Sequence, residues 1–166
     1  MRPAFAVGVS GGHDESMSTS DVVVRPIEPR DYEAWQRLFH AYREFYEYDR
    51  GQEVVDRVWG WIHDDTVEVN ALVAELDGEV VGFAHHRHYS RPSEGGCGVF
   101  LDDLFTAPEA RGRGVGRALI GRLAEIAREQ GCGKVRWVTA PDNRTAQRLY
   151  DDVAERTDWL TYDLLV

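Results

Sequence analysis

The chain has 166 residues, of which 43% are hydrophobic and 29% are charged, a composition typical of one soluble globular domain. Its formal net charge of −10 disfavours nucleic acid as a partner, because that binding depends on cationic contacts to phosphates. The sequence contains no apolar run of about 18 residues, so we expect no segment that spans a membrane. The excess of acidic side chains is compatible with a small cationic ligand or a basic peptide.

Residues 1–20 are rich in Gly, Ser and other polar residues, and their short apolar piece, Ala4–Val9, is too weak for a signal peptide. We therefore expect a disordered N-terminal tail over 1–20 and a single folded domain over 21–166. The two cysteines, Cys97 and Cys132, have no metal-ligand spacing, and we expect reduced thiols in a cytoplasmic protein.

The folded part begins with a β-branched segment, 22–27, which predicts a strand near a sheet edge because prolines follow it. Asp31 is a good N-cap residue for a helix that we expect to run through Tyr48. Apolar side chains recur at helical spacing along this segment and predict a face packed on the core: Trp35, Leu38, Phe39, Tyr42, Phe45 and Tyr46.

The end of this first helix also carries candidates for a ligand pocket. Tyr42, Tyr46 and Glu47 could line such a pocket wherever their side chains are exposed. Packing in the core is the alternative for the two tyrosines, and it is the more common use of aromatic residues at helical spacing.

A second helix is expected over 53–63, followed by two strands over 71–76 and 79–89. Asp77-Gly78 lies between these strands and is typical of a tight type I′ hairpin turn.

The second strand of this hairpin ends in a histidine cluster, His85, His86 and His88. His86 and His88 share one face of the strand, so a metal site is conceivable, but no third ligand is close in the sequence. We favour a solvated or substrate-facing strand end and assign no metal ligand.

The stretch Leu101–Gly121 has the most informative pattern. An apolar segment with two acids ends at Pro108, and an amphipathic helical pattern begins at Val115. Between them lie alternating glycines and arginines: Arg111, Gly112, Arg113, Gly114, Gly116 and Arg117. A strand, a glycine-rich turn and a helix N-terminus form an anion site suited to a diphosphate, with the arginines adding charge-assisted hydrogen bonds. A turn whose glycines merely allow tight packing is the alternative.

This turn differs from the two common nucleotide-binding motifs. The lysine and hydroxyl residue of a P-loop are missing, and the spacing of Gly112, Gly114 and Gly116 does not match the dinucleotide fingerprint.

The remainder of the chain predicts three further elements. Lys134–Thr139 reads as a strand, a helix begins at Asp142 or Asn143, and Trp159–Leu165 reads as a last strand.

Three motifs together resemble the GCN5-related N-acetyltransferases. Arg111, Gly114 and Gly116 fit the acetyl-CoA loop of that family, and Asn143–Tyr150 is similar to its N-x-x-A-x-x-L-Y helix. Leu101–Phe105 is similar to the L-E-D strand of the spermidine/spermine and thialysine acetyltransferases and their yeast histone-acetylating relatives. The resemblance covers Val22 to the C-terminus and implies an α/β (α+β) fold, a mixed sheet of about six to seven strands flanked by about four helices.

The resemblance also implies roles for individual residues. Asp102 stands where the subgroup has its proposed glutamate base, and Tyr150 matches the tyrosine acid that protonates the thiolate. An N–H near Leu104 or Phe105 would stabilise the oxyanion. The residues expected to contact acetyl-CoA are Leu104, Phe105, Thr106, Arg111, Gly112, Arg113, Gly114, Val115, Gly116, Arg117, Asn143 and Tyr150.

Two of these assignments stay open. Asp102 is one methylene shorter than the family's glutamate, so it acts either directly or through a bridging water. Asp102 and Asp103 point to opposite faces of a regular strand, unless a β-bulge intervenes. Asp103 is a candidate for contacting the acceptor.

The implied function is acetyl-CoA-dependent N-acetylation of a small cationic primary amine, polyamine-like or lysine-like, by direct attack in a ternary complex. A protein lysine or N-terminal acetyltransferase and a non-catalytic CoA-binding sensor are the alternatives. The subgroup also implies a homodimer, while neither nucleic acid nor a membrane is expected as a partner.

Overall fold

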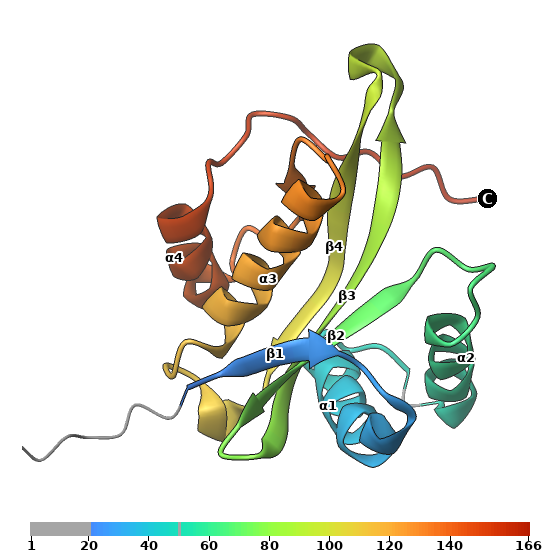
Figure 1. Cartoon of the computed structure of the whole chain (residues 1–166), viewed down its shortest axis with the longest axis vertical. Helices are drawn as coiled ribbons and strands as arrows, with labels where there is room; N and C mark the ends of the chain where they lie inside the picture. The colour runs from blue at the N-terminus through green and yellow to red at the C-terminus, as the bar shows by residue number, and fades with distance from the viewer. Residues whose placement is uncertain (1–20, 50) are drawn as a thin grey trace, which may run out of the picture.

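The computed structural model describes residues 21–49 and 51–166, and the tail expected over 1–20 lies outside them. The described part contains one five-stranded sheet in the order β1-β2-β3-β4-β5, with four α-helices around it (Figure 1). The strands are β1 Val23–Pro26, β2 Asn70–Leu76, β3 Glu79–Arg91, β4 Gly96–Thr106 and β5 Val135–Arg136. The helices are α1 Tyr32–Phe45, α2 Gln52–Ile62, α3 Val115–Glu129 and α4 Arg144–Val153. The mixed α/β class is confirmed, with fewer strands than expected.

The sheet is antiparallel from β1 to β4, and only β4 and β5 run parallel. The tight turn expected at Asp77-Gly78 is present, since both residues have the positive φ angles, 55° and 82°, that a type I′ turn requires. β5 pairs with β4 only at Val99 and Phe100. Beyond Phe100, β4 therefore has no neighbouring strand on that side in the described residues.

Helices cover both faces of the sheet. α1 packs on the face that carries Phe83, and α3 packs on the opposite face, where the start of the helix approaches Gly82 (Figure 1). Trp35 and Phe39 of the predicted α1 stripe are buried, whereas Phe45 is 57% exposed because α1 has passed the sheet there. Among residues 21–49 and 51–166, no helix combines the length and the apolar character needed to cross a bilayer.

Asp31 stands before α1 as expected, but its side chain does not cap the helix. Its carboxylate instead receives a bidentate pair of hydrogen bonds from Arg25, at 2.7 and 2.8 Å, and one from the Glu28 N–H. Because Asp31 is 4% exposed, the nearby guanidinium is a stronger partner than a helix N–H group. The residue therefore ties β1 to the start of α1.

The strand expected over Trp159–Leu165 is absent from the structure. After α4 the chain continues as an extended trace without a strand partner (Figure 1). In the described part of the chain no strand pairs with this segment, so its alternating apolar residues are not held against the sheet. The segment is almost fully solvent-exposed, with Trp159 at 84% and Leu165 at 91%.

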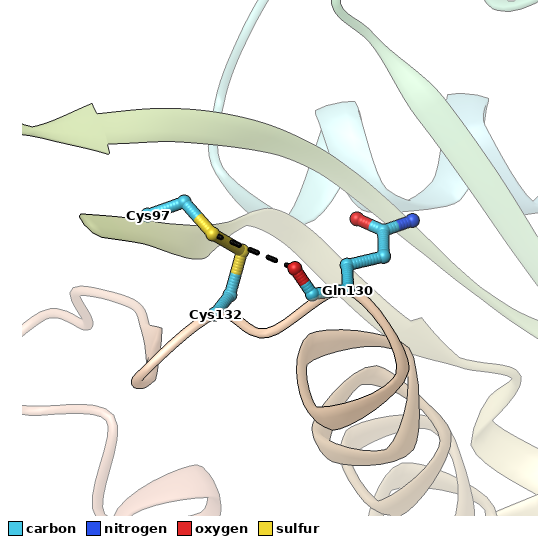
Figure 2. Close-up of a disulfide and its surroundings, with 3 residues drawn as sticks. All are labelled: Cys97, Gln130 and Cys132. Atoms are coloured by element: carbon cyan, nitrogen blue, oxygen red, sulfur yellow. Dashed lines mark hydrogen bonds between the residues drawn. A yellow bond between two sulfur atoms is a disulfide. The ribbon is translucent and has the colours of Figure 1, made fainter.

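The expectation of two reduced thiols is also wrong, because Cys97 and Cys132 form a disulfide. Cys97 lies at the start of β4 and Cys132 in the loop between α3 and β5 (Figure 2). The Gly133 N–H donates to the Cys97 carbonyl oxygen at 3.0 Å, which brings the two cysteines together. The dashed contact of Cys97 Sγ with the Gln130 carbonyl oxygen, 4.0 Å, is a van der Waals contact, since a disulfide sulfur carries no proton.

Reduction of this disulfide should destabilise the protein. The bridge spans 35 residues of sequence, and closing a loop of this length stabilises a fold by about 2–4 kcal/mol. Urea unfolding with and without a thiol reductant measures the difference. The double variant Cys97→Ser/Cys132→Ser is the control, and its unfolding curve should not respond to reductant. Identical curves for the native chain under both conditions would contradict the disulfide.

Candidate active site

The glycine-rich turn leads directly into α3, as the sequence predicts. Gly112 and Gly114 have φ angles of 77° and 83°, a left-handed conformation that side chains with a Cβ rarely adopt. Gly114 occupies the N-cap position, so the N–H groups of the first α3 turn have no acceptor within the helix. A Cβ added at either glycine would meet open space, so conformation rather than packing requires glycine there.

Gly116 has a different role, which matches the packing alternative. A Cβ at this position would lie 3.0 Å from the Leu149 side chain, so its absence lets α4 approach α3. The turn therefore presents main-chain donors, and Gly116 allows α4 to pack closely against the start of α3.

The three arginines surround this helix N-terminus at the surface. Arg111 donates from Nε to the Thr106 carbonyl oxygen at 3.3 Å and stacks over Phe105. Arg113 and Arg117 form ion pairs with Asp77 and Asp152. About half of each of these two arginine side chains is exposed, and exposed ion pairs are weak. Both guanidinium groups can therefore leave their aspartate partners and contact a bound phosphate.

The end of β4 offers free main-chain groups beside this turn. The Ala107 N–H donates to the Val81 carbonyl oxygen of the neighbouring strand at 2.8 Å. Since main-chain groups alternate between the two sides of a strand, those of Leu104 and Thr106 face the side where β5 is missing. The Thr106 carbonyl oxygen already accepts from Arg111, so the Leu104 groups and the Thr106 N–H are the ones open to a ligand. An extended amide-containing molecule can pair there as an added strand does.

A β-bulge lies in β4 at the two predicted acids. His85 pairs with Asp103 and His86 with Leu101, so Asp102 is the extra residue. The bulge brings Asp102 beside Arg87 and Asp103 beside His85, and these two β3 residues share one face of the sheet. The regular alternation, which places the two acids on opposite faces, is therefore interrupted.

Asp102 is exposed and paired. Its Oδ1 accepts a hydrogen bond from Arg87 Nε at 3.1 Å. Desolvation raises the pKa of the Asp102 carboxyl, and the Arg87 contact opposes this rise only in part. A carboxylate with a raised pKa is better matched to accepting a proton than an ordinary aspartate.

Asp103 lies in a hydrogen-bonded network that joins three elements. Its Oδ2 accepts from His85 Nδ1 at 2.9 Å, and its Oδ1 accepts from the Tyr42 hydroxyl. Burial by itself would raise the pKa of this carboxyl, but the contact with His85 and, to a smaller extent, the hydrogen bond from Tyr42 hold the pKa below its usual value. Asp103 is therefore an ionised carboxylate at neutral pH, and 26% of its side chain remains exposed.

The end of α1 and the start of α4 meet at this network. The rings of Tyr42 and Tyr46 are 4.9 Å apart, and Asn143 Nδ2 donates to the Tyr46 hydroxyl at 3.4 Å. Asn143 also caps α4, since its Oδ1 accepts from the Ala146 N–H. Asn143 therefore caps α4 and also joins it to the end of α1. Glu47 has a φ angle of 58° at the exposed end of α1, where its N–H donates to the Glu44 carbonyl oxygen at 3.1 Å.

Tyr150 lies half-buried on α4 with its ring 5.3 Å from that of Trp137. Burial, with a smaller contribution from Tyr46, raises the pKa of its phenol to about 12. No hydrogen bond from this hydroxyl reaches another residue within 21–49 or 51–166, so its proton is free to be donated.

Sequence reasoning missed two partners of the acids, Arg87 and His85, and the Trp35 indole that contacts His85. Arg87, His85 and Trp35 contact the site from elements distant in sequence, and Trp35 donates to His85 across 50 residues. Trp35 was read only as a core residue, and His85 only as part of a histidine cluster. The cluster in fact divides: burial lowers the pKa of His86 on the other face to about 4, and the described residues contain no group of three metal ligands.

A surface hollow of about 820 Å³ lies on the far side of Phe105, between α1 and the β2–β3 turn. Its walls include the Arg25–Glu75 ion pair and Arg37, but neither Tyr150 nor the two β4 acids. Leu104, Thr106, the two acids and Tyr150 all lie outside the walls of this hollow.

Comparison with known proteins shows which family the chain resembles. Residues 35–153 match the sequence model of the acetyltransferase (GNAT) family. D-amino-acid N-acetyltransferase HPA3 of Saccharomyces cerevisiae is 35% identical over 156 residues, which cover 93% of this chain and 97% of the yeast protein. Thialysine N-epsilon-acetyltransferase of Bos taurus is 32% identical over 108 residues, which cover 57% of this chain and 63% of the bovine protein.

Solved structures share the fold. Ribosomal-protein-alanine N-acetyltransferase from Brucella melitensis biovar Abortus 2308 has a TM-score of 0.77 and 24% identity, covering 88% of this chain and 100% of that one. AAC(6')-Iy in complex with a CoA-containing bisubstrate analogue has a TM-score of 0.75 and 21% identity, covering 89% and 99%. At these identities the likeness concerns the fold alone.

The family match and the near full-length relative show that the chain belongs to the acetyltransferase (GNAT) family. It is an acetyl-CoA-dependent N-acetyltransferase, as the sequence motifs predict. The residues present fit this acetyl donor, since main-chain donors at the turn suit a diphosphate and the open β4 edge suits an amide-containing arm.

Proposed function

We propose that the protein acetylates the primary amine of a small cationic acceptor, polyamine-like or lysine-like, by direct attack in a ternary complex. The observation that carries the proposal is the ionised carboxylate of Asp103, partly exposed beside the Tyr42–Tyr46 pair and next to the bulge at Asp102. A fixed anion attracts an ammonium group, and a second carboxylate next to it can take the proton that the amine must lose.

Each residue then has one role. Asp103 binds the ammonium group, and Asp102 accepts its proton directly or through water. The Leu104 N–H stabilises the oxyanion, because the Phe105 N–H faces β3 by the alternation of main-chain groups. Tyr150 donates its proton to the leaving thiolate.

The relatives support an amino-acid-like acceptor and add a second candidate. The yeast relative is named for D-amino acids, and the bovine one for the ε-amine of thialysine. Other relatives are named for L-2,4-diaminobutyric acid and phosphinothricin. The α-amine of a D-amino acid is therefore the second candidate, and the near full-length yeast relative favours it.

A thiol-release assay with acetyl-CoA and an amine panel tests the proposal. The panel contains polyamines, lysine and thialysine, D- and L-amino acids, aminoglycosides and a basic peptide. We expect turnover with free amines, reduced in Asp102→Asn. Turnover with the peptide alone would favour protein acetylation. Binding of CoA without turnover on any amine would favour the sensor alternative.

The proposed partner in solution is a second copy of this chain. The unpaired C-terminal segment exposes two aromatic and four aliphatic side chains: Trp159, Leu160, Tyr162, Leu164, Leu165 and Val166. An aromatic side chain buries about 150–250 Å², so this set approaches the roughly 800 Å² that each partner contributes to a standard interface. Two such segments can pair across a two-fold axis.

Light scattering after gel filtration should therefore find a dimer. Leu164→Asp places a charge in the apolar segment and should give a monomer, whereas Thr161→Asp changes a polar position of the same segment and should leave the dimer intact. A monomeric native chain would contradict the proposal, and so would a Leu164→Asp dimer of unchanged stability.

We also propose a cytoplasmic location, although the disulfide removes the argument from reduced cysteines. It was expected together with reduced cysteines, and disulfides persist mainly in oxidising compartments. Alkylation of free thiols in intact cells, followed by mass analysis of Cys97, shows the state in which the protein works.

A further inference from the structure

Both ring nitrogens of His85 have partners in the structure. Trp35 Nε1 donates to His85 Nε2 at 2.9 Å, and His85 Nδ1 lies 2.9 Å from Asp103 Oδ2. An indole N–H can only donate, so Nε2 must hold a lone pair. The proton of the imidazole is therefore on Nδ1, from which it is donated to Asp103.

The surroundings of His85 hold this tautomer in place. Trp35 is fully buried and His85 is 2% exposed. The aromatic rings of Phe39 and Phe83 pack against the imidazole with centroids 5.1 and 4.7 Å away. Protonation would put a hydrogen on Nε2 against the Trp35 N–H, so the Trp35 contact excludes the imidazolium.

The protonation state of His85 decides the net charge of the His85–Asp103 pair. A protonated His85 would form an ion pair with Asp103, and the pair would be neutral. A neutral His85 supplies a hydrogen bond and leaves the full negative charge on Asp103. The other charged or titratable groups that bear on this pair are Tyr42 and Arg43 from α1, His86 from β3 and Asp102 from β4.

We propose that His85 is a positioning residue: Trp35 holds it as the neutral Nδ1–H tautomer, so that it orients Asp103 without cancelling the charge that binds the acceptor's ammonium group. This rests on the proposed function, because it assigns Asp103 to the amine. The Trp35–His85–Asp103 chain contributes to amine affinity and does not touch acetyl-CoA.

Two amide variants separate the two contacts of the imidazole. The Asn side chain places an N–H₂ group close to the position of Nδ1, so His85→Asn keeps a donor for Asp103. The longer Gln side chain reaches the position of Nε2, so His85→Gln keeps an acceptor for Trp35. His85→Leu removes both contacts.

We expect His85→Leu to raise KM for the amine by about 10- to 100-fold, the factor associated with losing a hydrogen bond to a charged group. The dissociation constant for CoA, measured by calorimetry, should stay within about 3-fold of the native value because the glycine turn is untouched. His85→Asn should recover most of the amine KM, and His85→Gln should recover less. Equal amine KM for the native chain and His85→Leu overturns the proposal, and so does better recovery by Gln than by Asn.

Trp35→Phe supplies the readout that a purely structural role would not change. In this variant no N–H opposes a hydrogen on His85 Nε2, so the imidazolium is no longer excluded at low pH. The KM of Trp35→Phe for the amine should then rise between pH 8 and pH 6 more steeply than the KM of the native chain. Parallel pH profiles would overturn the assignment.

The test is separable from the proposed function. The ¹⁵N shifts of His85 in the native protein, assigned by their loss in His85→Asn, should show a protonated Nδ1 and an unprotonated Nε2. If this tautomer is present but the native chain acetylates no amine, the proposed function fails. If amines are acetylated and His85 is the Nε2–H tautomer or the imidazolium, this inference fails alone.

Discussion

Replacing Tyr150 by Phe should lower kcat by about 100-fold or more, the usual contribution of a positioned general acid. The native phenol keeps its proton because burial raises its pKa to about 12, and it makes no hydrogen bond to the described residues. A phenylalanine ring fills the same space beside Trp137, so the packing of α4 should survive. Steady-state kinetics with saturating acetyl-CoA and amine measure the effect.

The pH profile provides a further check on this role. Since the acid form of Tyr150 persists up to about pH 12, Tyr150 should cause no loss of kcat on the alkaline side below about pH 11. Tyr32→Phe is the matched control. Tyr32 stands at the start of α1, and its hydroxyl contacts Asp56 of α2, so its loss should leave the native kcat unchanged. Native kcat in Tyr150→Phe would exclude the phenol as the acid.

Gly114→Val should weaken CoA binding by about 10-fold or more. Gly114 has a φ angle of 83°, and a β-branched residue there costs about 1–3 kcal/mol or forces the turn to change shape. Either outcome turns the first N–H groups of α3 away from the diphosphate. Calorimetric titration with CoA measures the dissociation constant.

Gly121→Val is the control for this substitution. Gly121 lies on the exposed face of α3, where an added Cβ meets nothing within 4 Å and φ is not positive. CoA affinity should be unchanged there, and stability should not fall, because glycine is a poor residue inside a helix. Equal CoA affinity in Gly114→Val and the native chain would mean that the turn does not bind the diphosphate.

The glycine turn and its flanking elements could be predicted from the sequence because the determinants are local. A strand that ends at a proline, glycines in alternation and the apolar stripe from Val115 are all read within about twenty residues. The Asp77-Gly78 turn and the position of Asn143 at the start of α4 are local for the same reason.

The environment of the acids could not be predicted, because it depends on contacts distant in sequence. The bulge that brings Asp102 and Asp103 to neighbouring β3 partners is a property of the pairing between strands, and period-two alternation cannot show it. Trp35 lies 50 residues from His85 and Tyr42 lies 61 residues from Asp103, so neither hydrogen bond leaves a sequence signal.

Two of the wrong expectations have related causes. The disulfide depends on the approach of the α3–β5 loop to the start of β4, which no spacing of Cys97 and Cys132 encodes. The last strand was predicted from a correct apolar alternation, but a strand needs a neighbour, and the described part of the chain supplies none.

The central claim is that main-chain amides at the glycine turn, helped by arginines, bind the pyrophosphate of CoA and so direct the acetyl group to the amine. Calorimetry with CoA, dephospho-CoA and pantetheine tests it most directly, because pantetheine keeps the thiol arm but has no pyrophosphate. We predict similar dissociation constants for CoA and dephospho-CoA and one about 100-fold higher for pantetheine, as expected for two or more charge-assisted hydrogen bonds. Equal binding of CoA and pantetheine would contradict the account.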